Sequence, residues 1–97
     1  MKVRWTGKAE DDLMAQCGHV ANEDPVLAER IGSEVLMRVG GLANHPYRGR
    51  SGRVEGTREL PLPGLPWIAV YVIKDDAVVI LRLMHGAQSW PPEDVDQ

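Results

Sequence analysis

The sequence has few of the features that small proteins use to bind metals, cross membranes or leave the cell. Its one cysteine, Cys17, cannot form an internal disulfide, and no spacing of cysteine and histidine suggests a zinc site. No apolar run approaches the roughly 20 residues of a membrane span, and the opening "MKVRWTGKAEDD" turns acidic where a signal peptide would be apolar. We therefore expect no metal, no cofactor, no membrane contact and a cytoplasmic location.

A net positive charge is also missing, because the formal net charge of the chain is -3. General nucleic-acid binders are usually basic overall, so this chain offers at most a local basic patch. That patch lies between residues 45 and 58, where four arginines and the single acid Glu55 give a charge of +3. The segment is either an ordinary solvated loop or a working surface for an acidic partner. Its arginines are Arg48, Arg50, Arg53 and Arg58.

The length of 97 residues predicts one domain over residues 1–97. Alternating apolar residues predict a short strand over residues 2–5, and Thr6 is placed to cap a helix that ends near Ala21. Asp24 is placed to cap a second helix, with Pro25 at its first position. The apolar stripe expected on this second helix consists of Ala28, Ile31, Val35, Val39 and Leu42.

Three further strands are expected over residues 54–62, 66–74 and 77–85, with Asp75-Asp76 as a two-residue turn between the last two. The predicted order is β-α-α-β-β-β. The predicted fold class is α+β, with the two helices packed on one face of a small, mainly antiparallel sheet. The pattern leaves open which edge of the sheet takes the first strand. Trp90, beside two prolines, is expected to hold the C-terminal tail against the domain.

The predicted turn also fixes the faces of the last hairpin. It places Lys74 opposite Ala77, Tyr71 opposite Ile80 and Ala69 opposite Arg82. One face is then aliphatic, and we assign it to the helices; it carries Ile68, Val70, Val72, Val79, Leu81, Leu83 and His85. The other face is very apolar for a face left to water, so we predict that a partner covers it. It carries Trp67, Tyr71, Ile73, Val78, Ile80, Arg82 and Met84.

Three segments, "GRSGRVEGTREL", "PWIAVYVI" and "VVILRLMHGAQSWP", resemble the RelE/ParE toxin superfamily of type II toxin–antitoxin modules. The resemblance extends over nearly the whole chain. It implies a small bacterial toxin that a cognate antitoxin, a small acidic DNA-binding protein, holds inactive in a hetero-oligomer. The RelE branch cleaves mRNA on the ribosome, whereas the ParE branch inhibits DNA gyrase.

The branch is suggested by three features. The chain is acidic, Trp67 stands near the place where several nucleases of the family carry an arginine, and "ILRLMH" is more similar to the ParE branch. We therefore expect a ParE-like gyrase inhibitor. The alternatives are a ribosome-dependent mRNA endoribonuclease and a family member that is no longer toxic.

The candidate catalytic residues, should the chain be a nuclease, are Arg58, Arg82 and His85. His85 would exchange protons and the arginines would clamp phosphate. Arg82 and His85 point to opposite faces of a regular strand, unless the strand bulges near Met84. The alternative to a catalytic role is that His85 is a structural residue that closes the strand end. The residues expected to contact a partner are Arg50, Arg53, Trp67, Tyr71, Ile80, Arg82 and Met84.

Two of these arginines have structural alternatives. Arg82 is costly to bury without a partner, so it either forms an ion pair with Glu59 or Glu55 or faces the antitoxin or target. In a regular strand, Arg58 would point to the same face as core residues such as Leu60. It must therefore lie at an edge, follow a bulge, or pair with a buried carboxylate.

Overall fold

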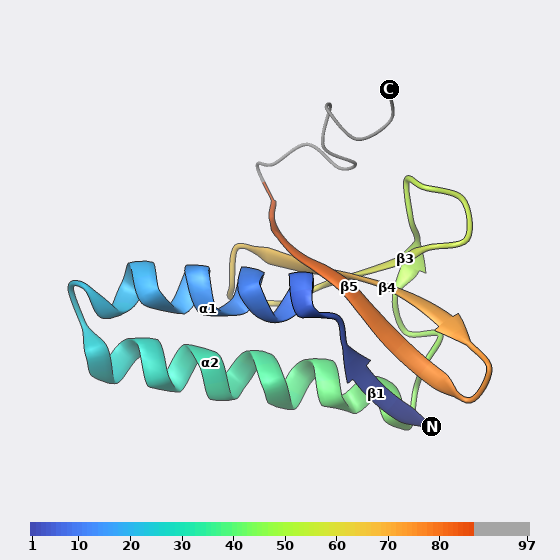
Figure 1. Cartoon of the computed structure of the whole chain (residues 1–97), viewed down its shortest axis with the longest axis horizontal. Coiled ribbons are helices and arrows are strands. Elements are labelled where there is room, and N and C mark those ends of the chain that lie inside the picture. The colour runs from blue at the N-terminus through green and yellow to red at the C-terminus, as the bar shows by residue number, and fades with distance from the viewer. Residues whose placement is uncertain (87–97) are drawn as a thin grey trace.

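Two antiparallel helices pack against a five-stranded sheet in the computed structural model, which describes residues 1–86 (Figure 1). The predicted α+β class is confirmed. Neither helix of this part of the chain has the length and apolar character that crossing a membrane requires. Trp90 lies outside the described residues. The elements are β1 (Lys2–Trp5), α1 (Gly7–Ala21), α2 (Pro25–Gly40), the 3-10 helix η1 (Gly41–Ala43), β2 (Arg50–Ser51), β3 (Arg58–Pro61), β4 (Trp67–Lys74) and β5 (Ala77–His85).

Both helices begin at the predicted caps. The Thr6 hydroxyl accepts a hydrogen bond from the Ala9 amide at 3.1 Å, and the Asp24 carboxylate accepts one from the Leu27 amide at 3.0 Å. Each side chain satisfies a helix N–H that has no partner within the helix. The predicted stripe on α2 faces the core, because Ala28, Val35, Val39 and Leu42 are buried and Ile31 packs against them.

The sheet has the strand order β1-β5-β4-β3-β2. Strand β1 takes the edge beside β5 and is parallel to it, while the other pairs are antiparallel. The strand predicted over residues 54–62 is shorter, because residues 52–57 form a turn that includes Gly56 at a φ of 86°. That turn folds the arginine segment back on β3. The result is the short strand β2, which the sequence analysis did not predict.

The predicted register of the last hairpin is confirmed near its turn but is wrong beyond Tyr71. Tyr71 faces Ile80 as expected, whereas Ala69 faces Leu83 rather than Arg82 because of a bulge between Val70 and Tyr71. The bulge lies where β5 passes the end of β1. There the amide of Thr6 donates to the Ile80 carbonyl at 3.0 Å, and its hydroxyl donates to the Leu81 carbonyl at 3.2 Å.

The predicted assignment of the two hairpin faces is also wrong. Tyr71 and Ile80 are fully buried in the core beneath the helices, and Trp67 and Met84 are 4% and 3% exposed. The phenol of Tyr71 belongs in this core because its oxygen donates to the Pro46 carbonyl at 2.7 Å and accepts from the Gly49 amide at 2.9 Å. These four side chains are therefore core residues of the chain and do not form the exposed partner surface that we expected.

Candidate functional site

The arginine segment folds into what we call the arginine hairpin, residues 45–59, around one buried carboxylate. Glu59 on β3 has a side chain that is 2% exposed, and it lies 3.3 Å from Arg50 Nη2 and 3.5 Å from Arg53 Nε. It also accepts a hydrogen bond from the Arg53 backbone amide at 3.0 Å. Both arginines remain about half exposed. The segment is therefore a defined surface, in which an internal acid anchors the arginines.

The pKa of Glu59 reflects this anchoring. Burial by itself raises the pKa, because the charged form loses water. The hydrogen bonds from the Arg53 amide and the Arg50 side chain, with the positive charges of both arginines, outweigh burial and lower the pKa below its ordinary value. Glu59 is therefore held as a carboxylate, and its charge offsets one of the two arginine charges.

Arg58 is held by carbonyl oxygens. They explain how this charged side chain can occupy the strand face that also carries core residues. Its Nε and Nη2 donate to the Gly49 carbonyl at 3.1 and 2.7 Å, and Nη2 also reaches the Tyr47 carbonyl at 3.2 Å. The guanidinium carbon lies 5.2 Å from the centre of the Tyr47 ring, within cation–π range. None of the three structural explanations that we considered included this arrangement, in which the backbone of the preceding loop binds the side chain.

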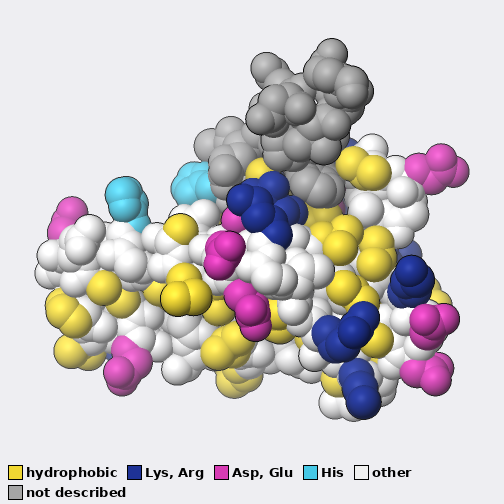
Figure 2. Space-filling model, viewed as in Figure 1, with side chains coloured by type: hydrophobic (Ala, Val, Ile, Leu, Met, Phe, Trp, Pro, Cys, Tyr) yellow, Lys and Arg dark blue, Asp and Glu magenta, His cyan; other side chains and the backbone are white. Residues whose placement is uncertain are grey.

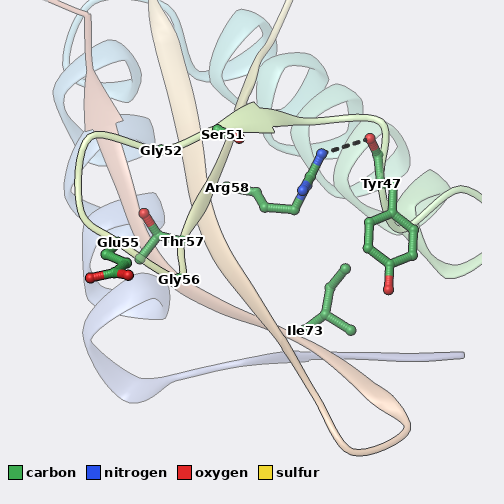
Figure 3. Close-up of a pocket in the computed structure, with 8 residues that line it drawn as sticks. All are labelled: Tyr47, Ser51, Gly52, Glu55, Gly56, Thr57, Arg58 and Ile73. Atoms are coloured by element: carbon green, nitrogen blue, oxygen red, sulfur yellow. Dashed lines mark hydrogen bonds between the residues drawn. The ribbon is translucent and has the colours of Figure 1, made fainter.

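A hollow of about 450 Å³ opens beside Arg58 (Figure 3). The Arg58 side chain extends toward Tyr47, whereas Glu55 lies on the far side of the hollow and points away from the guanidinium. Ile73 from β4 contributes an apolar wall. The lining residues are Tyr47, Ser51, Gly52, Glu55, Gly56, Thr57, Arg58 and Ile73.

Two glycines are required for the close packing of this hairpin. A Cβ on Gly49 would lie 2.6 Å from the Tyr71 hydroxyl oxygen and 2.9 Å from the Glu59 carbonyl oxygen. A Cβ on Gly52 would lie 2.1 Å from the Thr57 hydroxyl oxygen. The backbone therefore approaches its neighbours more closely than any larger residue permits, and the hairpin is fixed against the sheet.

Of the two alternatives for Arg82, the structure shows an ion pair, but its partner is Asp12 of α1 and not Glu59 or Glu55. Its Nε and Nη2 lie 2.7 and 3.2 Å from the two oxygens of Asp12, which also accepts the Leu83 amide at 2.9 Å. Asp12 replaces the strand partner that β5 loses where β1 ends. One signal for it was present in the sequence, since Asp12 follows the apolar Ala9 by three positions and so shares its helix face.

The three candidate catalytic residues are not brought together. Arg58 is paired across the sheet with Tyr71, whereas His85 is paired with Trp67, four residues or about 13 Å away along β4. Arg82 is in register with Val70 and so lies on the opposite face from both. The bulge in the hairpin precedes Arg82, so it leaves Arg82 and His85 on opposite faces.

The helices expose apolar side chains that the sequence analysis missed. In Figure 2, hydrophobic side chains are exposed along both helices. A hollow of about 380 Å³, which we call the helix groove, is lined by Trp5, Glu10, Leu13, Met14 and Leu36. The signal was present as apolar residues outside the core stripe. The exposed ones are Met14, Val26, Leu27, Leu36 and Met37, with exposed fractions of 41–71%.

Comparisons with known proteins identify similar sequences and structures. The family described as "ParE toxin of type II toxin-antitoxin system, parDE" matches residues 3–90. "Putative toxin Y4kP" of Sinorhizobium fredii is 39% identical over 90 residues, which cover 93% of each chain. "Toxin RelE2" of Caulobacter vibrioides is 29% identical over 87 residues, which cover 90% of this chain and 97% of that protein.

Two solved structures are similar in fold and sequence. The chromosomal ParDE toxin–antitoxin system from P. aeruginosa contains a chain with a TM-score of 0.81 and 30% identity, covering 88% of this chain and 95% of that one. The toxin–antitoxin complex RelBE2 from Mycobacterium tuberculosis contains a chain with a TM-score of 0.58 and 29% identity, covering 87% and 95%. The fold therefore resembles the ParDE chain more closely than the RelBE2 chain.

Proposed function

Because the chain belongs to the ParE toxin family of type II toxin–antitoxin systems, we propose that this toxin inhibits DNA gyrase by binding it. The observation that carries the proposal is the separation of Arg58, Arg82 and His85. RNA cleavage requires an acid, a base and a cation around one phosphate. The greater similarity to the ParDE chain also favours the ParE branch, whose members we expect to act on gyrase.

The state of the two arginines supports a binding role over a catalytic one. Arg82 already pairs with Asp12, and side-chain exposures of 16% and 11% leave little of either group available to a phosphate. Arg58 is held by two backbone carbonyls. A nuclease would have to dismantle both arrangements, whereas a protein that binds gyrase needs only shape and a few anchor residues. Gyrase acts on chromosomal DNA, so the site of action is the cytoplasm.

An antitoxin that covers the helix groove neutralises the toxin in this proposal. The solved relatives named ParDE and RelBE2 are toxin–antitoxin systems. Met14 and Leu36 line the groove and are 71% and 52% exposed, so a partner gains hydrophobic free energy by burying them. The expected partner is the small acidic DNA-binding protein of the same module.

The test compares two assays on the same preparations. The purified chain and its His85→Ala variant are each added to a gyrase supercoiling reaction and to translating ribosomes with a reporter mRNA, which is then analysed by primer extension. We expect both proteins to inhibit supercoiling and to leave the mRNA intact. A nuclease that uses His85 would instead cut the mRNA at codon positions, and His85→Ala would slow the cutting by roughly 10²–10⁴-fold. That result would overturn the proposal.

A further inference from the structure

We propose that the hollow beside Arg58 binds a carboxylate side chain from an acidic peptide segment of the antitoxin. The inference deepens the proposed function and rests on it for the identity of the partner. It starts from an unbalanced charge. Within residues 1–86, Arg50, Arg53 and Arg82 each have a carboxylate within 4.0 Å, whereas Arg58 has none. A partly buried guanidinium that has only carbonyl acceptors keeps its full charge available to a ligand.

Arg58 lines the hollow, and its hydrogen bonds leave part of the guanidinium without an acceptor among the described residues. Its Nε and Nη2 are occupied by the carbonyls of Gly49 and Tyr47, and in the described part of the chain Nη1 has no acceptor. The Tyr47 ring supports the guanidinium from one side. Because the side chain is already ordered, a ligand that binds it does not have to fix a flexible arginine. A charge-assisted hydrogen bond to such a group is about twice as strong as a neutral one.

The hollow also suits a peptide side chain in its other walls. Ile73 offers an apolar surface on which the methylene groups of an aspartate or glutamate can pack. The Thr57 hydroxyl donates to the Val54 carbonyl and is therefore already engaged, which leaves the hydroxyls of Ser51 and Tyr47 as the ones available to a ligand. One arginine and one hydroxyl provide donors for a single carboxylate.

The charge of the surrounding hairpin favours a peptide over nucleic acid. Four arginines and two glutamates lie between residues 45 and 59, so the net charge is +2. A nucleic acid gains affinity by neutralising a row of phosphates with several free cations. Here Glu59 is shared by Arg50 and Arg53 and offsets part of their charge, so the hairpin does not offer a row of free cations. One directed cation within this setting fits an isolated carboxylate.

The test is a titration of the full chain with labelled ligands, measured by fluorescence anisotropy. The probes are an octapeptide of alternating glutamate and alanine, its glutamine–alanine counterpart, and a single-stranded RNA octamer. We expect the glutamate peptide to bind more tightly than either of the others. Arg58→Gln should weaken its binding about 10-fold or more, and Tyr47→Ala about threefold through loss of the stacked ring. Arg48→Gln, in the same segment but outside the hollow, is the matched control and should change binding less than twofold.

Three outcomes would overturn the inference. Equal losses in Arg58→Gln and Arg48→Gln would mean that diffuse charge attracts the peptide. Tighter binding of the RNA octamer would mean that nucleic acid is the preferred ligand. Equal binding of the glutamate and glutamine peptides would mean that the hollow does not recognise a carboxylate. Tyr47→Ala keeps the backbone acceptor at an exposed position, so it provides a folded variant if Arg58→Gln unfolds. The supercoiling assay of the parent chain separates the two proposals, because gyrase inhibition without peptide binding contradicts only this one.

Discussion

The C-terminal part of β5, beyond the end of β1, and the arginine hairpin each join arginine to a carboxylate, but with opposite results. In β5, Arg82 meets Asp12 in a one-to-one pair whose side chains are 16% and 11% exposed. In the hairpin, Arg50 and Arg53 share Glu59, and their own side chains are 57% and 47% exposed. The first arrangement cancels its charge inside the fold. The second leaves positive charge at the surface, so the number of arginines per carboxylate distinguishes a structural pair from a candidate binding surface.

The largest effect is expected when the structural pair is broken. Asp12→Ala leaves Arg82 with no carboxylate and the Leu83 amide with no acceptor. Loss of one partner from a mostly buried pair costs about 3–5 kcal/mol of the free energy of unfolding. Urea unfolding followed by circular dichroism measures this loss. The matched control is Asp11→Ala on the exposed side of α1, which should change the free energy by less than about 0.5 kcal/mol. Similar losses in the two variants would contradict a structural role for the pair.

A smaller loss is expected when the packing of the hairpin is disturbed. Gly49→Ala places a methyl group 2.6 Å from the Tyr71 hydroxyl oxygen and 2.9 Å from a backbone carbonyl, so the loop must move. Overpacking of this kind costs about 1–3 kcal/mol. Thermal unfolding measures the change, and Gly18→Ala serves as the control because its added methyl group meets no atom within 4 Å. If Gly49→Ala were as stable as the parent, the hairpin would not be fixed against Tyr71.

The smallest effect concerns pH. The pKa of Glu59 is lower in the folded chain than its ordinary value, so the stabilisation is present above the unfolded pKa of about 4.3. It is lost as the pH falls through the folded pKa. We expect the free energy of unfolding to decline over this acidic range, and Glu59→Gln to reduce the slope of that decline. Urea unfolding at a series of pH values measures the slope, and an unchanged slope in Glu59→Gln would show that other carboxylates account for it.

Features set by neighbouring residues could be predicted from the sequence. Thr6 and Asp24 cap the helices through contacts three residues away, and the turn at Asp75 depends on adjacent residues. The register of the hairpin beyond Tyr71 could not be predicted, because the bulge occurs where the distant strand β1 ends at Trp5. A period-two pattern holds only while the strand is regular, and one extra residue exchanges the faces beyond it.

The same distinction applies to the candidate site. The cluster of arginines was visible in the sequence. The fixed arrangement of their side chains, however, depends on Glu59 and on the loop carbonyls that hold Arg58. The partner of Arg82 lies 70 residues earlier in the chain, and no local pattern connects them. Aliphatic side chains were assigned to the core and Tyr71 to the surface, yet the polar tip of Tyr71 is satisfied by the same loop that carries the arginines.

The central claim is that this toxin acts by binding gyrase, and its stoichiometry tests that claim most directly. The measurement is supercoiling activity at a fixed gyrase concentration well above the dissociation constant, with increasing amounts of the purified chain. The account predicts that inhibition by the parent rises in proportion to the toxin and saturates near an equimolar ratio, while the reporter mRNA stays intact. The account would be contradicted if gyrase stayed active and the reporter mRNA were cut when far fewer toxin molecules than ribosomes were present.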